Sequence, residues 1–455
     1  MSEKLTHSRL ALILLGLLGG TAVCYGAHLD VQASRIVDQL HVLASFSDDT
    51  FPAVTRILFT PNDMEARAYV KSLMTEAGLE VREDAMGNIF GKWQGSEPAL
   101  GSVLTGSHCD AIPLAGMYDG TLGVVGAVEA LAALKRAGFK PRRSLEVMMF
   151  TSEEPTRFRL SCVGSRALAG ALAADTLDVK LDENGTSFQE AANAVGYGGE
   201  SHQAILDATR IPKGSVDFFV ELHIEQGPLL EQEKTDIGVV TAIAAPAALE
   251  VHFYGDGGHA GAQLMPLRND AGLAGAELAL AVEAHTLATG AGDSVGTTGI
   301  FEVSPNAVNS VPREARLGID VRDIDGQRRD SVVQSILDSA ATIAERRRVK
   351  VTTTLINQDP PASCDDRIQS AIAAAAQQLG LSTKHMVSRA YHDSLFMARI
   401  APTGMIFIPC REGWSHRPDE FASEEDIGNG VSALALTMAE LSGGSWGDSK
   451  SKEEL

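Results

Sequence analysis

Clusters of histidine and acidic residues recur along this 455-residue chain, most of them at or just beyond the end of a short apolar run. Imidazole and carboxylate groups without thiolates are ligands that suit zinc, manganese and related divalent ions. Five such clusters are hard to attribute to chance, and together they predict a metal site. They are Gly106-Ser107-His108-Cys109-Asp110, Met117-Tyr118-Asp119-Gly120, Thr151-Ser152-Glu153-Glu154, Glu221-Leu222-His223-Ile224-Glu225-Gln226-Gly227-Pro228 and Trp414-Ser415-His416-Arg417-Pro418.

A site for two metal ions needs a carboxylate that bridges the ions and further ligands on each of them. Asp119 is predicted to be the bridge. His108 and His223 are then expected to complete the coordination of the first ion. Glu154 and His416 are expected to complete the coordination of the second ion.

Glu153 is left over by this assignment. Neighbouring glutamates that leave a strand cannot both present the same geometry, so one binds metal while the other stays free. A free carboxylate that takes a proton from a metal-activated water is what metal-assisted hydrolysis requires. We therefore predict that Glu153 is the general base. Asp110 is expected to orient the His108 imidazole, and Cys109 to point away from the site.

The segments around these clusters alternate strand-like apolar runs with amphipathic helical stretches, which is typical of α/β proteins. Apolar strands separated by helices indicate a mainly parallel sheet covered on both faces. Ligands of such sheets bind at the carboxyl ends of the strands, where the clusters occur. Strands are predicted at 101–105, 145–150, 217–222 and 405–408, and helices at 31–45, 62–78, 122–137 and 367–379.

The pattern changes after Val240. The order strand, helix, two strands, helix, strand is ferredoxin-like, and it predicts an inserted α+β domain at 244–357. Asp359-Pro360-Pro361 marks the return to the catalytic domain, which is expected to comprise 28–243 and 358–445. The elements predicted in the insert are strands at 248–254, 299–303, 315–321 and 350–357, and helices at 266–288 and 329–346.

Composition excludes several classes of protein. The chain has 38 basic and 59 acidic residues, a net charge of −21, so nucleic acid should be repelled. Hydrophobic residues make up 44%, which supplies a sizeable core and argues against disorder. Four of the five cysteines are widely spaced and form no CxxC pair, so we expect buried free thiols. The endoplasmic reticulum lumen, predicted below, would nevertheless permit a disulfide.

Both ends of the chain resemble targeting signals. A basic start and the apolar run Leu10–Val23 precede small residues near Ala27, the order of a secretory signal peptide. We expect 1–27 to be removed, which leaves no membrane anchor; an uncleaved anchor is the alternative. The tail 446–455 ends in Lys452-Glu453-Glu454-Leu455, close to the Lys-Asp-Glu-Leu retrieval signal. Together these features predict residence in the endoplasmic reticulum lumen.

From about residue 35 to 440, the clusters in their order resemble the M20-type dinuclear metal amidohydrolases. The branch is that of N-carbamoyl-amino-acid hydrolases, allantoate amidohydrolases and ureidoglycolate amidohydrolases, as indicated by the 223–228 sequence and by Gly258-His259-Ala260-Gly261. Within it, 388–399 and 357–362 are most similar to plant-type ureidoglycolate amidohydrolases. Tyr391 stands where the carbamoylases and allantoate enzymes typically carry glycine.

The resemblance implies hydrolysis of ureidoglycolate to glyoxylate, ammonia and carbon dioxide by a homodimer. It also implies that the inserted α+β domain at 244–357 is a lid and dimerisation domain. It implies two divalent ions, with manganese preferred to zinc, cobalt or nickel. The chemistry is consistent: a ureido carbonyl is a poor electrophile because two nitrogens donate into it, and two metal ions both activate water and polarise the carbonyl. Glu153 would carry the water proton to the leaving nitrogen.

The resemblance also implies two contacts to the substrate carboxylate, from Arg322 and Asn309. Arginine offers a planar fork that binds a carboxylate through two hydrogen bonds. The alternative for Arg322 is an ion pair with Asp320 or Asp323.

Four further residues are implied near the reacting group. His259 is expected to reach it from the partner subunit and to stabilise the oxyanion, whereas a lone histidine in a glycine-rich loop is otherwise simply exposed. Gln226 is expected to bind the ureido amide. Tyr391 and His392 are expected to contact the substrate hydroxyl or carboxylate, with a core tyrosine whose hydroxyl is already hydrogen-bonded as the alternative.

Three other functions stay open at this point. The same machinery would serve allantoate or an N-carbamoyl amino acid. A metallopeptidase or acylase is a second alternative, although Gln226, Asn309 and Arg322 favour a small carboxylate substrate. A non-catalytic binding protein is the third, and Glu153 beside a full set of ligands argues against it.

Overall fold

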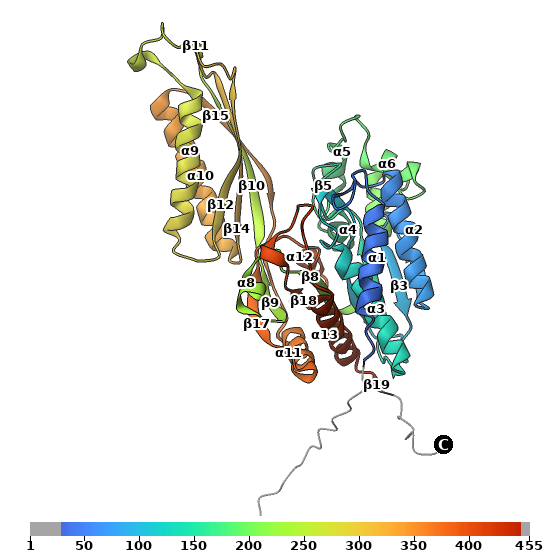
Figure 1. Cartoon of the computed structure of the whole chain (residues 1–455). Coiled ribbons are helices and arrows are strands. Elements are labelled where there is room, and N and C mark those ends of the chain that lie inside the picture. The colour runs from blue at the N-terminus through green and yellow to red at the C-terminus, as the bar shows by residue number, and fades with distance from the viewer. Residues whose placement is uncertain (1–28, 447–455) are drawn as a thin grey trace, which may run out of the picture.

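The computed structural model describes residues 29–446, which form two bodies joined by neighbouring strands (Figure 1). The predicted signal peptide lies outside the described residues, as does the predicted tail beyond Trp446. Among residues 29–446, no helix combines the length and the apolar character needed to cross a membrane.

The larger body is built on a nine-stranded sheet of order β16-β9-β18-β8-β4-β7-β3-β2, with β17 beside β9. Its centre is parallel: β8 (Val216–Ile224) lies between β18 (Thr403–Ile408) and β4 (Ser102–His108), and β4 also pairs with β7 (Leu145–Phe150). The predicted α/β class with a mainly parallel sheet is therefore confirmed. The outer strands are β2 (Glu80–Glu83), β3 (Ile89–Trp93), β9 (Ile237–Ile243), β16 (Ala362–Ser363) and β17 (Thr383–Ser388). Their pairings are antiparallel except for the parallel pair of β9 and β17.

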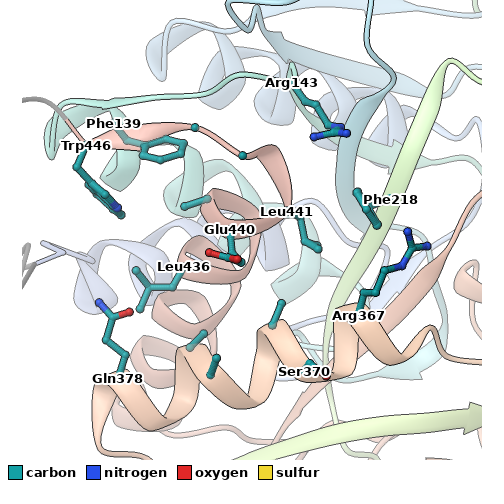
Figure 2. A pocket seen from close by; sticks show the side chains of 16 residues that line it. Phe139, Arg143, Phe218, Arg367, Ser370, Gln378, Leu436, Glu440, Leu441 and Trp446 are labelled. Carbon is teal, nitrogen blue, oxygen red and sulfur yellow. The ribbon is translucent and has the colours of Figure 1, made fainter. Parts of the chain in front are cut away.

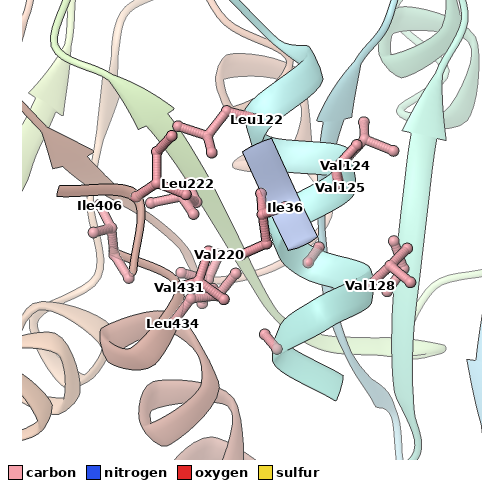
Figure 3. Packing of buried hydrophobic residues seen from close by; sticks show 14 of the residues in the cluster. Ile36, Leu122, Val124, Val125, Val128, Val220, Leu222, Ile406, Val431 and Leu434 are labelled. Atoms are coloured by element: carbon pink, nitrogen blue, oxygen red, sulfur yellow. The ribbon is translucent and has the colours of Figure 1, made fainter. Parts of the chain in front are cut away.

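Helices cover both faces of this sheet. One face carries α1 (Ala33–Ser45), α2 (Pro61–Glu76), α3 (Thr121–Arg136), α11 (Asp366–Leu379) and α13 (Glu424–Ser442). Figure 3 shows Ile36 of α1 and Val125 of α3 packed with Val220 of β8 and Val431 of α13 in the main core. The opposite face is covered by α4 (Val163–Leu168) and α12 (Ser394–Met397). The cysteines of the described residues, Cys109, Cys162, Cys364 and Cys410, are buried and free.

The smaller body, residues 245–358, is here called the lid domain. Its four strands are antiparallel in the order β12-β14-β10-β15, which is the ferredoxin-like arrangement. Helix α9 begins at Ala271 rather than at the expected 266, because Asp270 caps it by accepting a hydrogen bond from the Leu273 amide. The elements are β10 (Ala245–Tyr254), α9 (Ala271–Ala288), β12 (Val295–Ser304), β14 (Glu314–Asp323), α10 (Gly326–Arg347) and β15 (Lys350–Gln358).

A buried ionic cluster marks the point where the chain returns from the lid domain. The Asp359 carboxylate accepts hydrogen bonds from Arg166 at 3.1 and 2.6 Å, from Arg399 at 2.9 Å and from the Tyr391 hydroxyl at 2.7 Å. Arg166 lies in α4, so this cluster joins the returning chain to the catalytic domain.

Arg329 of α10 is also buried, with only 2% of its surface exposed. Its guanidinium donates to the backbone carbonyl of Ala245, at 3.2 Å, and to that of Asp359. One side chain of the lid domain thus holds both connecting segments.

We predict that Asp359→Asn lowers the free energy of unfolding at pH 7 by about 2 kcal/mol, because it leaves buried Arg166 without its anionic partner. Burial raises the pKa of Asp359, but Arg166 and Tyr391 outweigh that effect and leave the pKa lowered. A lowered pKa stabilises the fold above the unfolded-state value, and this stabilisation is lost as the pH falls through the folded-state value. The difference in the free energy of unfolding between Asp359→Asn and wild type, measured by urea unfolding, should therefore be smaller at acid pH. Exposed Asp366→Asn is the control, and an equal loss in both variants would contradict the prediction.

A surface groove of about 690 Å³ lies between α11 and α13. Figure 2 shows Arg143, Phe218 and Arg367 at one side of it and Trp446 at another. Phe218 lies near the start of β8, whereas the histidine and acidic clusters follow the strand ends. The groove therefore belongs to the opposite edge of the sheet.

Candidate metal centre

The five predicted ligands meet at the carboxyl edge of the central sheet. Two groups each offer three ligand atoms within 4.8 Å of one another: His108, Asp119 and His223 form one, and Asp119, Glu154 and His416 form the other. Asp119 belongs to both groups. His108 ends β4 and His223 lies in β8, whereas the other three occupy loops that follow strands or precede α3.

The two oxygens of Asp119 face different partners. Oδ1 lies 3.1 Å from His223 Nε2 and 3.5 Å from His108 Nε2. Oδ2 lies 3.1 Å from His416 Nε2, and the same nitrogen is 3.1 Å from Glu154 Oε1. One carboxylate oxygen toward each group is the arrangement that a bridging ligand requires.

Backbone carbonyls fix the two buried imidazoles. His108 Nδ1 lies 3.0 Å from the Asp110 carbonyl oxygen, and His223 Nδ1 lies 2.8 Å from that of Ile224. Donation from Nδ1 leaves Nε2 free to act as a ligand. Gly120 has φ +67°, and a Cβ there would lie 2.4 Å from His108 Nε2, so only glycine fits.

Asp110 does more than the sequence indicates. Its Oδ1 lies 3.7 Å from His108 Nδ1, and its carboxylate accepts the backbone N–H groups of Glu153 at 3.1 Å and Glu154 at 2.9 Å. Burial raises its pKa to about 6. Asp110 therefore positions the loop after β7 in addition to lying against the His108 ring.

Glu153 lies beside the two groups without belonging to either. Its side chain is almost fully buried, and Oε2 lies 3.9 Å from His108 Nε2. Ser152 has φ +54°, which turns the chain so that Glu154 faces His416 instead. Burial and the neighbouring carboxylate of Glu154 raise the pKa of Glu153 well above its ordinary value, against the opposing effect of His108.

The ligand groups influence each other strongly. Burial raises the pKa of Asp119, but hydrogen bonds from His108, His223 and His416 outweigh it and leave the pKa well below its ordinary value. Hydrogen bonds to Asp119 and Glu154 raise the pKa of His416 to about 11. The carboxylates of Asp119 and Glu154 thus stabilise positively charged groups at the metal centre.

Two supporting residues are not among the sequence predictions. Glu420 Oε1 accepts the backbone N–H groups of Tyr118 at 2.8 Å and Asp119 at 3.0 Å. The Ser415 hydroxyl lies 2.9 Å from Glu420 Oε2 and 3.0 Å from Asp119 Oδ2. Glu420 lies four residues after His416, but this spacing does not indicate a contact with Asp119.

Two predicted substrate contacts lie at the metal centre. Gln226 Nε2 donates to Asp119 Oδ2 at 2.8 Å, and Gln226 itself has φ +56°. The His392 ring packs edge-on against His223, with ring centroids 4.6 Å apart, and its Nε2 lies 3.1 Å from the Ser388 hydroxyl. Both side chains are thus close enough to the ligands to border a bound substrate.

Two other predicted contacts already have partners within the chain. The Tyr391 hydroxyl belongs to the Asp359 cluster, which matches the alternative of a core tyrosine. Arg322 Nε donates to Asp320 at 2.8 Å, which matches the alternative ion pair, and Nη1 donates to the Arg389 carbonyl at 3.2 Å.

His259 and Asn309 lie together at the far end of the lid domain. β11 (Gly258–His259) pairs with β13 (Ser310–Val311) there, and the Ala260 amide donates to the Asn309 carbonyl at 2.9 Å. This end points away from the catalytic domain (Figure 1), and both residues are exposed. Within one chain the structure does not bring them to the metal centre.

The donor set fits a pair of divalent ions. Imidazole and carboxylate ligands, one carboxylate shared by the two groups, and imidazoles held through Nδ1 are the features of such sites. A hydrolytic site needs in addition a base that binds neither ion, and Glu153, the predicted base, belongs to neither ligand group.

Known proteins share this architecture. The chain is 58% identical to "Ureidoglycolate hydrolase" of Arabidopsis thaliana, over 91% of this chain and 87% of that protein. It is 36% identical to "N-carbamoyl-L-amino acid amidohydrolase" of Geobacillus stearothermophilus, over 91% and 100%. A crystal structure described as AtUAH in complex with (S)-hydroxyglycine is 57% identical, covers 91% of this chain and 98% of its own, and superposes with a TM-score of 0.83.

The resemblance inferred from the clusters is confirmed by these similarities. A family model described as Peptidase family M20/M25/M40 matches residues 104–440, the region that carries all five ligands and the free glutamate, and this chain belongs to that family.

Proposed function

We propose that this chain hydrolyses the ureido C–N bond of ureidoglycolate and yields glyoxylate, ammonia and carbon dioxide. The observation that carries this proposal is that the Asp119 carboxylate is shared by two groups of candidate ligands, while Glu153 lies beside them and belongs to neither. The substrate follows from similarity to a ureidoglycolate hydrolase and to a structure with bound (S)-hydroxyglycine.

The chain is a metal-dependent hydrolase of amide bonds by family, and we propose manganese as its metal. His108, Asp119 and His223 would hold one ion, and Asp119, Glu154 and His416 the other. Ions bound there supply two effects, a lower pKa for water and polarisation of the ureido carbonyl.

Glu153 would move the proton. It accepts one from the attacking water and delivers it to the leaving nitrogen, which departs as a neutral amine or ammonia. Its burial keeps bulk water from competing for this proton. The carbamate and hydroxyglycine that result decay without further catalytic groups.

The substrate would be held by residues at the boundary with the lid domain. Arg322 keeps Nε on Asp320 and Nη1 on the Arg389 carbonyl, and its other N–H groups would bind the substrate carboxylate. Asn309, at the far end of the lid domain beside His259, would reach that carboxylate only from the partner subunit. Gln226 binds the ureido amide next to Asp119. His392 would border the hydroxyl of the substrate, whereas the Tyr391 hydroxyl stays hydrogen-bonded to Asp359.

We propose a homodimer formed through the lid domain. Helix α9 exposes Leu280 and Leu287 by 68% and 73%, and neighbouring β12 exposes Phe301 by 46%, an apolar surface of the kind that a second copy covers. His259, at the far end of the same domain, would then act in the partner's site. Residence in the endoplasmic reticulum lumen is a further proposal, which rests on the two terminal segments of the sequence.

The substrate is tested by ammonia release from ureidoglycolate, allantoate and N-carbamoyl amino acids with and without added Mn(II). We expect ureidoglycolate to give the highest kcat/KM, with activity lost after chelation and restored by Mn(II). Preference for allantoate or for an N-carbamoyl amino acid would refute the proposed substrate but leave the hydrolase in place.

A further inference from the structure

A thiol contacts the carboxylate of Glu153. Cys162 Sγ lies 3.4 Å from Glu153 Oε1, while the other oxygen, Oε2, faces His108. Across residues 29–446, Cys162 provides the only hydrogen bond donated to either carboxylate oxygen of Glu153. One side chain therefore holds one carboxylate oxygen while the other is turned toward the metal centre.

The backbone fixes the position of this thiol. Residues 162–164 run alongside 151–153: the Cys162 amide donates to the Glu153 carbonyl at 2.8 Å, and the next two amides donate to the carbonyls of Ser152 and Thr151 at 2.9 and 2.8 Å. The sulfur and the carboxylate thus belong to segments that are held together at three successive residues.

The contact leaves no space for adjustment. Cys162 is fully buried and has φ +55°. A Cβ on Gly164 would lie 2.2 Å from Asn88 Oδ1 and 2.7 Å from the Thr151 amide nitrogen, so glycine permits the close approach of the two segments. Sγ is therefore held in place.

The thiol is suited to donate. Burial, and then the nearby carboxylate of Glu153, raise the pKa of Cys162 well above its ordinary value, so the sulfur keeps its proton. A protonated thiol is a weak hydrogen-bond donor, and a carboxylate is the acceptor to which such a donor bonds best.

We propose that Cys162 is a positioning residue for the general base: its S–H donates to Oε1 of Glu153 and keeps Oε2 toward His108 as the oxygen that moves the proton. Cys162 itself touches neither metal nor substrate. This proposal rests on the base role of Glu153 but not on the identity of the ureido acid.

The test compares Cys162→Ala, Cys162→Ser and wild type in the metal-loaded enzyme. Loss of a hydrogen bond to a charged group should lower kcat roughly tenfold in the alanine variant, with KM unchanged. Serine keeps a donor and should recover turnover to within roughly threefold of wild type. Cys364→Ala, which removes a thiol from the same buried cluster but away from Glu153, should leave kcat unchanged and shift the melting temperature as Cys162→Ala does.

A double-mutant cycle separates positioning from packing. If Cys162 acts through Glu153, Cys162→Ala should have no further effect on the residual turnover of Glu153→Gln. The proposal is overturned if Cys162→Ala matches Cys364→Ala in kcat, if serine fails to recover turnover, or if the two losses multiply in the double variant.

The assay uses the ureido acid that the wild-type enzyme hydrolyses fastest. If that acid is not ureidoglycolate, the proposed substrate is wrong. The Cys162 variants are then compared on the acid that the wild-type enzyme does hydrolyse, and the test of Cys162 is unaffected. If Glu153→Gln retains normal turnover, the proposed base fails, and Cys162 loses its role with it.

Discussion

Glu153→Gln is expected to reduce kcat roughly a thousandfold while leaving both metal ions bound. The amide keeps the size of the side chain but cannot accept a proton from water. Because Glu153 belongs to neither ligand group, its replacement removes no ligand. Steady-state turnover and metal content by inductively coupled plasma mass spectrometry measure the two effects in one preparation.

Glu146→Gln is the matched control. Glu146 is a buried glutamate near the start of β7, the strand whose other end leads into the loop that carries Glu153, and it pairs with Lys92 at 3.3 Å. Its replacement should leave kcat within roughly twofold of wild type, since it is remote from the reacting groups. Near-normal turnover in the Glu153 variant, or loss of metal from it, would remove Glu153 from the role of base.

Asp119→Ala should have the largest effect of any single ligand replacement. The one carboxylate serves both ligand groups, so both ions should be lost and kcat should fall by roughly four orders of magnitude. Replacement of His223 or His416 should weaken one ion only. Metal content per chain after dialysis against Mn(II) measures the difference.

Asp359→Asn is the control for unfolding in this experiment. It is expected to destabilise the protein but to keep both ions, because Asp359 lies in the ionic cluster beside the lid domain. An Asp119 variant that binds one ion as tightly as wild type would show that the two groups do not share this carboxylate.

Much of the fold follows from local patterns. The strand predicted at 145–150 coincides with β7, and the apolar runs near 101–105 and 217–222 extend by a few residues into β4 and β8. A strand buried on both faces must be apolar throughout, which makes it visible in the sequence. The metal ligands follow such strands, so their convergence could be predicted from their order alone.

Other parts of the fold and of the candidate site leave no recognisable pattern in the local sequence. Four helices have only five to eight residues each, too few for a clear helical period. They are α4 (Val163–Leu168), α5 (Ala174–Asp178), α6 (Phe188–Ala194) and α7 (His202–Thr209). Glu420 supports Asp119 across 301 residues of sequence, and Ser415 does so across 296. Such contacts depend on how the sheet and its loops assemble, which no short pattern records.

Tyr391 and Cys162 show the same limit of prediction from sequence. Nothing in the sequence around Tyr391 shows that its hydroxyl meets Asp359, because that contact forms only when the chain returns from the lid domain. Cys162 appeared among four widely spaced cysteines with no distinguishing neighbours, and only the folded backbone places it against Glu153.

The two connections to the lid domain lie side by side, with Ala247 paired to Gln358. Paired residues on adjacent strands are only about 5 Å apart, a gap that one or two residues span. The catalytic domain therefore does not depend on this module to close its own chain. Evolution can enlarge, shorten or exchange the module as a unit, and selection on assembly and selection on chemistry can proceed largely independently.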